Sequence, residues 1–162
     1  MKYNYCPVCG RKLSLKVVGD EGLKPHCSKC DKFYFDRVRP CVIALVMNEF
    51  DEVVLIKQSK VSAEHWVVVA GYLSGGENFE EAVAREVLEE TGQVVNFSTY
   101  LGSYPVDKKE LVMSAFQCDV NKLPFNRSKE VDDIKWVKLN DAIKFVPPES
   151  VAFKLISKLM HV

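Results

Sequence analysis

Residues 71–93, GYLSGGENFEEAVAREVLEETGQ, describe one capped helix that follows a glycine-rich loop. Asn78 is a favourable N-cap residue, and Glu81, three residues later, completes a capping box. Gly92 stands where a helix ends in the left-handed conformation. The stretch therefore predicts a helix over about residues 79–91.

The acidic residues of this helix lie on its apolar side. An apolar stripe is formed by Phe79, Ala82, Val83 and Val87. At about 100° per residue, Glu86 and Glu90 fall within that stripe and point towards the protein. Because unpaired buried carboxylates cost several kcal/mol, a sequence that places two of them there is expected to supply a cation. Glu89 lies at the edge of the stripe, where Arg85 can pair with it at i,i+4.

Three carboxylates in this arrangement suit a hard divalent ion. Magnesium and manganese prefer oxygen ligands and leave room for substrate phosphates. We expect Glu86, Glu89 and Glu90 to bind Mg²⁺ or Mn²⁺. Such a cluster suits hydrolysis of a phosphoanhydride, in which a glutamate of the cluster or from elsewhere acts as general base. The alternative is a solvated face braced by salt bridges, and the position of the glutamates on the apolar face argues against it.

The first 38 residues carry two CxxC pairs. Cys6 and Cys9 form the first pair and Cys27 and Cys30 the second, and 17 residues separate the pairs. This spacing is typical of a structural zinc site, in which four thiolates close a tetrahedral shell. His26 borders the second pair and is an alternative ligand, although four cysteines already suffice. We expect a zinc ribbon over residues 1–38, with folding free energy supplied by the metal.

The composition is that of a globular protein. The chain has 162 residues, 48% of them hydrophobic, enough for one medium domain and a small appendage. Its start has no apolar signal core, and no run approaches the roughly 18 apolar residues of a membrane span. We therefore expect a cytoplasmic protein without a membrane partner. Residues 1–40 hold nine Lys or Arg against four Asp or Glu, a basic excess that suits either phosphate-bearing partners or ordinary solvation.

The remaining apolar runs predict a mixed sheet. Short runs rich in β-branched residues occupy positions 41–48, 52–58, 65–72, 94–105, 111–120 and 132–139. The first two read as a hairpin, and the third delivers the glycine-rich loop. A short helix is expected at 141–145 and an amphipathic helix at 149–160. Strands with helices on both faces predict an α/β/α sandwich over residues 39–162.

The helix and its loop resemble a known family. Gly71, then Glu77 after five residues, then residues 85–92 after seven more match the Nudix box, with Gln93 in place of the usual final aliphatic residue. The resemblance implies a Nudix fold and a metal-dependent hydrolase.

The same resemblance assigns roles around the metal. It implies that Glu77 lies close to the metal shell and that Arg85 orients the glutamates. It also implies a further acidic residue from a loop before a late strand. Glu130 is the candidate for that role and Asp133 the second, and a solvated loop is the alternative for both.

The likeness extends along the chain. The four-cysteine ribbon and residues 33–46, 65–77 and 136–156 resemble the NADH pyrophosphatase branch of Nudix hydrolases. In that branch a further domain usually precedes the ribbon, whereas this sequence begins at the ribbon. The branch also carries SQPWPFPxS after the box, whereas residues 103–111 here read SYPVDKKEL. The resemblance implies cleavage of a nucleoside diphosphate joined to another group: NAD(H), another dinucleotide, ADP-ribose or a capped RNA end. It also implies a homodimer.

Several residues are candidates for substrate contacts. Tyr72 corresponds to a position that stacks on a substrate ring in that branch. Lys108 and Lys109 can contact a phosphate, or simply be solvated. The aromatic triplet Phe33, Tyr34 and Phe35 provides either contact between subdomains or a stacking surface for a nucleobase.

The alternative to a hydrolase is a protein of a different functional class. A basic ribbon beside an inactive Nudix domain would make a nucleic-acid-binding or nucleotide-sensing protein. Loss of catalysis should remove glutamates from the box, and Glu77, Glu86, Glu89 and Glu90 are all present. The sequence therefore favours an enzyme.

Overall fold

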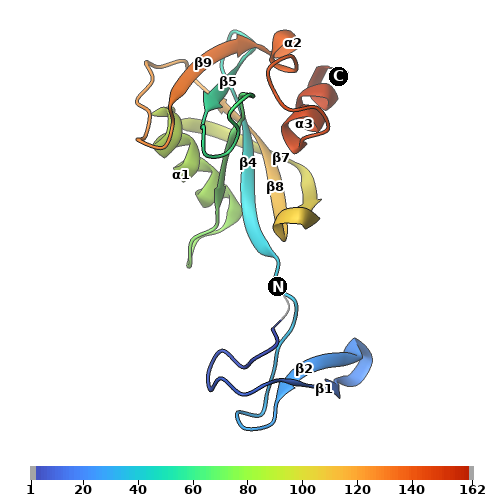
Figure 1. Cartoon of the computed structure of the whole chain (residues 1–162). Helices are drawn as coiled ribbons and strands as arrows, with labels where there is room; N and C mark the ends of the chain where they lie inside the picture. The colour runs from blue at the N-terminus through green and yellow to red at the C-terminus, as the bar shows by residue number, and fades with distance from the viewer. Residues whose placement is uncertain (1–2, 161–162) are drawn as a thin grey trace. The chain divides into compact units, whose positions relative to one another are not determined.

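The computed structural model describes residues 3–160, and the chain divides into two compact units, Met1–Val38 and Arg39–Val162. The first unit holds a three-stranded antiparallel sheet (Figure 1). Its strands are β1 (Ser14–Val17), β2 (Leu23–Cys27) and β3 (Lys32–Phe33). The 3₁₀ turn η1 (Gly19–Glu21) joins the first two strands into an antiparallel hairpin.

The second unit is built on a six-stranded mixed sheet of order β7-β8-β4-β5-β9, with β6 paired to β4. The strands are β4 (Arg39–Met47), β5 (Glu52–Lys57), β6 (Val69–Tyr72), β7 (Val95–Val106), β8 (Leu111–Val120) and β9 (Asp133–Lys138). Strand β4 is central: it runs parallel to β8 and antiparallel to β5 and β6. The 3₁₀ turn η2 (Asp107–Lys109) joins β7 to β8.

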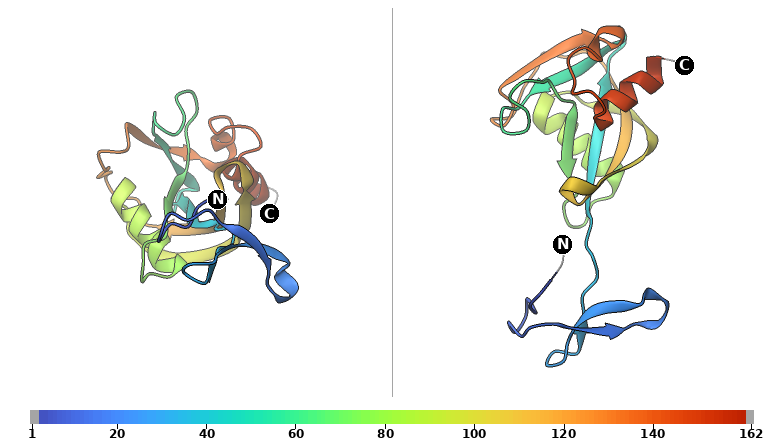
Figure 2. Two further views of the ribbon diagram at one scale, coloured as in Figure 1. Left: turned by 60° about the horizontal axis from the view of Figure 1, so that its bottom comes forward. Right: turned by 45° about the vertical axis from the view of Figure 1, so that its right-hand side comes forward.

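Helices cover both faces of this sheet, as predicted. Helix α1 (Phe79–Thr91) lies on one side, and α2 (Leu139–Ala142) and α3 (Val151–Met160) lie on the other (Figure 2). Alternate residues of β4 serve the two cores, because successive side chains of a strand point to opposite faces. Val42 packs in the core beneath α1, and Ile43 in the core beneath α3. The predicted α/β/α sandwich is confirmed.

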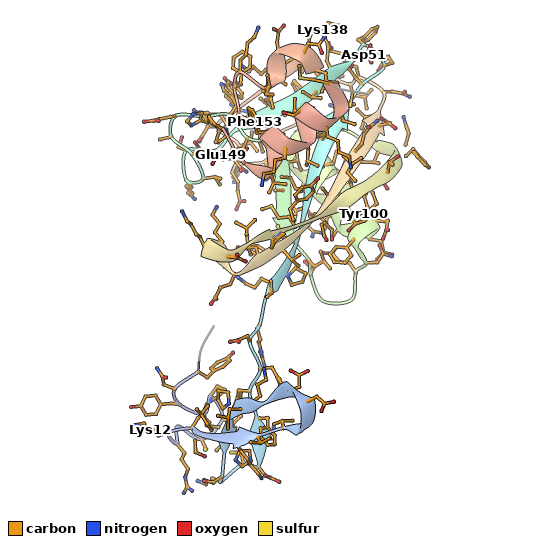
Figure 3. All side chains as sticks on the ribbon, turned by 90° about the vertical axis from the view of Figure 1, so that its right-hand side faces the viewer. Lys12, Asp51, Tyr100, Lys138, Glu149 and Phe153 are labelled. Atoms are coloured by element: carbon orange, nitrogen blue, oxygen red, sulfur yellow. The ribbon has the colours of Figure 1, made fainter. Side chains whose placement is uncertain are left out.

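Side chains fill both layers, and exposed aromatic rings remain at the sheet edge. Figure 3 labels Tyr100 on β7 and Phe153 on α3. The ring of Tyr100 meets Phe116 edge-on, with 5.6 Å between the ring centroids. The two cysteines outside the ribbon, Cys41 and Cys118, are buried in the sheet.

Two elements differ from the prediction by more than two residues at one end. The strand expected at 65–72 is regular only from Val69, because its pairing with β4 ends at Ala44 and the amide of Trp66 instead donates to the carbonyl of Phe145. The short helix expected at 141–145 begins earlier, at Leu139, and the chain continues beyond it in tight turns. None of the described helices is long and apolar enough to cross a membrane.

Candidate active site

The helix that carries the glutamates is fixed at both ends. Asn78 Oδ1 accepts from the Glu81 amide at 2.8 Å, and Glu81 Oε2 accepts from the Asn78 amide at 2.9 Å. Gly92 is left-handed, with φ 75°, and its amide donates to the carbonyl of Leu88 at 2.9 Å. The predicted capping box and helix stop are both present, and the helix ends where the sequence places its end.

The three helix glutamates differ in exposure. Glu90 is 6% exposed, the Glu86 side chain is 14% exposed, and the Glu89 side chain is 56% exposed. The first two therefore face the protein, as the periodicity of the apolar stripe predicted. Glu89 faces solvent at the edge of the same cluster.

Arg85 joins the loop to the helix carboxylates. Its Nη2 and Nε bind both oxygens of Glu77 at 2.7 and 3.0 Å, and its Nη1 donates to Glu86 at 2.8 Å and to Glu89 at 3.2 Å. Hydrogen bonds from Arg85, and then from the Ser74 amide, lower the pKa of Glu77 to about 2. Glu77 is thus held ionised, and Arg85 fixes the carboxylates around it.

Glu90 is the most buried of the three helix carboxylates. Gln58 Nε2 donates to its Oε1 at 2.8 Å, whereas its Oε2 is buried and has no hydrogen-bond partner among the described residues. Burial raises the pKa of Glu90 to about 7 against the hydrogen bond from Gln58, and the charges of Glu86 and Glu130 raise it further. A buried, unpartnered carboxylate oxygen beside other carboxylates fits a divalent cation, which would satisfy the oxygen and offset the charge.

Glu130 belongs to this cluster although it lies far along the sequence. Glu86, Glu89, Glu90, Ser128 and Glu130 line one cavity of about 420 Å³. Asp133, the second candidate, pairs with Lys57 in the ladder between β5 and β9 and does not line that cavity. The structure therefore brings Glu130 to the helix glutamates and leaves Asp133 outside.

The approach of Glu86 depends on Gly71. A Cβ atom at Gly71 would overlap the carboxylate of Glu86, so Glu86 can keep this position only while residue 71 of β6 has no side chain. Cys41 Sγ donates to the Gly71 carbonyl at 2.8 Å from the neighbouring strand β4. Sequence reasoning did not find Gln58 or the contact of Cys41, because both partners are about 30 residues away along the chain.

A second cavity, of about 490 Å³, adjoins the glutamates and contains further predicted contact residues. Tyr72, Arg85 and Lys109 are among its lining residues, and Lys108 is not. Tyr72 is 49% exposed, and the Arg39 guanidinium lies 5.0 Å from its ring centroid. A more apolar cavity of about 310 Å³ shares Lys109 with it and extends beneath α3. Charged groups therefore line the cavity beside the glutamates, and mostly apolar side chains line the cavity beside α3.

The aromatic triplet does not form one surface. Tyr34 is only 8% exposed and packs in the ribbon core with Cys6 and Cys27, which corrects the expectation that its ring is available for stacking. Phe33 packs on His26, with 4.6 Å between ring centroids, and Phe35 is 45% exposed. Of the three residues, Phe35 is the most exposed.

The four ribbon cysteines converge. The sulfur atoms of Cys6, Cys9, Cys27 and Cys30 all lie within 4.8 Å of one another. His26 Nε2 is instead hydrogen-bonded to Asp31 at 2.9 Å, outside this group. The Tyr34 hydroxyl lies 3.0 Å from Cys6 Sγ, and this hydrogen bond lowers the pKa of Cys6 to about 6, which favours the thiolate that a metal requires. The cluster is compatible with zinc.

Comparison with known proteins identifies relatives along nearly the whole chain. A protein from Photobacterium profundum named NAD-capped RNA hydrolase NudC is 31% identical over 97% of this chain and 58% of its own length. A protein of the same name from Escherichia coli O157:H7 is 30% identical over 95% of this chain and 59% of its own length. The chain thus spans under two thirds of the length of these curated relatives.

Solved structures share the fold. A NUDIX hydrolase from Nitrosomonas europaea aligns with a TM-score of 0.78 at 20% identity, covering 99% of this chain and 93% of that one. The NUDIX domain of Shewanella oneidensis NrtR, solved in complex with ADP ribose, aligns with a TM-score of 0.67 at 19% identity, covering 84% and 92%. The family model described as the NUDIX domain matches residues 37–157. The chain belongs to the NUDIX family.

Proposed function

We propose that this protein hydrolyses the pyrophosphate bond of a nucleoside diphosphate joined to another group, with Mg²⁺ or Mn²⁺, and releases a nucleoside monophosphate. The observation that carries the proposal is the buried, unpartnered Oε2 of Glu90 beside Glu86, Glu89 and Glu130. Four carboxylates around one cavity repel one another unless cations are bound among them.

The residues of the site divide the work. Glu86, Glu89 and Glu90 hold the divalent ion, which when bound offsets phosphate charge and lowers the pKa of water. Arg85 and Glu77 position these carboxylates through their shared hydrogen bonds. Glu130 supplies a fourth carboxylate from a separate segment of the chain. In the ribbon, Cys6, Cys9, Cys27 and Cys30 hold a structural zinc ion.

The substrate we propose is an NAD(H)-like dinucleotide, ADP-ribose or a related compound, including a capped RNA end. The names of the curated relatives refer to NAD-capped RNA. The half-exposed ring of Tyr72 is suited to stacking on a substrate ring, and Lys109 to contact with a phosphate. Lys108 is exposed and is a further proposed phosphate contact. The exposed ring of Phe35 in the first unit is proposed separately as a stacking surface for a nucleobase. We also propose that the protein is a homodimer.

A panel of substrates tests the proposal. NADH, NAD, ADP-ribose, FAD, nucleotide sugars and NAD-capped RNA are incubated with Mg²⁺ or Mn²⁺, and nucleoside monophosphate is measured. We expect release from at least one dinucleotide-like compound, abolished by EDTA. Binding of ADP-ribose without hydrolysis of any compound would contradict the proposal and favour a nucleotide sensor. Clear preference for NADH would show that the altered segment 103–111 still supports dinucleotide recognition.

Gly71→Ala is expected to lower kcat by about 10- to 100-fold, because the new methyl group displaces the Glu86 carboxylate by an ångström or more. Gly75→Ala is the matched control, since a Cβ at Gly75 meets no atom within 4 Å. The measurement is steady-state hydrolysis of the best substrate, with melting temperatures for both variants. Equal activity of the two alanine variants would show that the close approach is not needed.

Binding of Mn²⁺ is expected to weaken as the pH falls below about 7. Burial raises the pKa of Glu90 to about 7, so a proton competes with the metal for this carboxylate below that pH. The dissociation constant should rise by up to about tenfold per pH unit, the limit for release of one proton. Electron paramagnetic resonance titration between pH 5.5 and 8 measures it. An affinity that is constant across this range would contradict the assignment of Glu90 as a ligand.

A further inference from the structure

Gln93 stands where the Nudix box usually ends in an aliphatic residue, and its side chain is fully buried. Its amide group makes two hydrogen bonds with one residue of another segment. Gln93 Oε1 accepts from the Leu123 amide at 2.9 Å, and Gln93 Nε2 donates to the Leu123 carbonyl at 3.1 Å. The side chain thus pairs with the backbone of Leu123 as a neighbouring strand would. An aliphatic side chain could make neither bond.

The end of α1 holds a second point on the same segment. The Asn126 amide donates to the Thr91 carbonyl at 3.0 Å. Gly92 allows this approach, because a Cβ there would lie 2.7 Å from the Asn126 Cβ. The last residue of α1, Thr91, therefore holds Asn126, and Gln93, the second residue after the helix, holds Leu123.

The far end of this segment is fixed to β5. The Asp132 amide donates to the Lys57 carbonyl at 2.8 Å, and Asp132 Oδ2 accepts from the amide and hydroxyl of Ser59 at 2.7 and 2.6 Å. Residues 121–132 contain no helix or strand. Hydrogen bonds such as these therefore hold their backbone in place of the hydrogen bonds of a strand ladder. Glu130 lies between the two attachments.

We propose that Gln93 is a positioning residue for Glu130. The helix that bears Glu86, Glu89 and Glu90 also bears, at its C-terminal end, the attachment of the segment that bears Glu130. The bonds from Gln93 to Leu123 thereby fix Glu130 in relation to the helix carboxylates. The inference rests on the proposed function, since Glu130 must take part in the reaction for its placement to matter.

A double-mutant cycle tests this role in the full chain. Gln93→Leu restores an aliphatic residue and removes both hydrogen bonds, and Gln93→Met does so with a side chain of similar length in case the leucine variant does not fold. We expect a fall in kcat of about 10- to 100-fold with little change in KM. In the Glu130→Gln background the same substitution should change kcat by less than about twofold, because it acts through Glu130.

Hydrogen exchange provides a readout that does not depend on activity. The amides of Leu123 and Asn126 should exchange faster in Gln93→Leu than in the wild type, while those of β4 stay protected. Ile156→Val is the matched control, since Ile156 is fully buried in the core on the opposite face of the sheet. It should lower the melting temperature without changing exchange at Leu123 or kcat.

The outcomes separate the two proposals. An inactive wild type contradicts the proposed function and, with it, the role of Gln93. An active wild type overturns the role of Gln93 alone if Gln93→Leu keeps full activity, if its loss is equally large without Glu130, or if exchange at Leu123 is unchanged. A loss that depends on Glu130, together with faster exchange at Leu123, supports it.

Discussion

Glu90→Gln should abolish hydrolysis, with a fall in kcat of about 1,000-fold or more, while the protein remains folded. The amide has the size of the carboxylate but lacks the charge and the second acceptor oxygen that a divalent ion requires. The wild-type oxygen Oε2 is buried, has no partner among the described residues and lies near Glu86 and Glu130. We therefore expect the carboxylate to serve binding of a cation rather than stability of the metal-free protein.

The stability of this variant gives an independent check. Because burial raises the pKa of Glu90 from 4.5 in a reference state to about 7, the folded protein favours the protonated form. The ionised carboxylate therefore costs stability, and that cost develops as the pH rises from about 4.5 to about 7. At pH 8 without metal, Glu90→Gln should melt at the same temperature as the wild type or higher.

A matched control separates the site from the helix. Glu80 is exposed in the first turn of the same helix, so Glu80→Gln makes the same chemical change away from the cavity. Its kcat should equal that of the wild type, and its affinity for Mn²⁺ should be unchanged. Full activity of Glu90→Gln would overturn the assignment of the catalytic carboxylates.

Removal of zinc should unfold the described part of the first unit, residues 3–38, and leave the second unit folded. The buried hydrophobic cluster of the described part of the first unit consists of Cys6, Cys27 and Tyr34, so two of its three members are metal ligands in our proposal. Apolar side chains of its hairpin stay exposed instead of adding to that core, among them Leu15 at 65% and Val17 at 65%. Binding of structural zinc is worth about 10–16 kcal/mol in small zinc domains, more than so small a core supplies.

Nuclear magnetic resonance can follow this prediction residue by residue. Chelation, or Cys27→Ser, should collapse the amide dispersion of residues 3–38 and leave the signals of the NUDIX domain in place. Cys118→Ala is the control, because Cys118 is buried in β8 of the second unit and its loss should leave one zinc per chain. Unchanged spectra after complete removal of zinc would show that the ribbon folds without metal.

Local patterns carried much of the fold. The capping box, the glycine stop and the periodicity of α1 are contained within 15 residues, so the sequence alone located the helix and the inward side of Glu86 and Glu90. The strands were recognisable as β-branched runs for the same reason. The parallel pairing of β4 with β8 joins residues about 70 positions apart, and no local pattern encodes it.

The parts that could not be predicted are contacts between distant segments. Periodicity shows which side of α1 carries Glu90, but the partner Gln58 is the residue that follows β5, 32 positions away. The burial of Tyr34 could have been predicted from alternation. In an extended chain the side chain of Tyr34 points to the face opposite those of Phe33 and Phe35. Gln93 was visible as a departure from the box, whereas its partner Leu123 lies 30 residues on.

Fixed caps at both ends of α1 constrain the number of residues between them as strictly as their identity. One residue inserted between Asn78 and Glu90 would turn all that follows by about 100° and advance it by about 1.5 Å. Either the carboxylates would move out of the cavity, or Gly92 and Gln93 would lose their contacts with residues 123–126. A redesign of this protein therefore has to keep the number of residues in this helix.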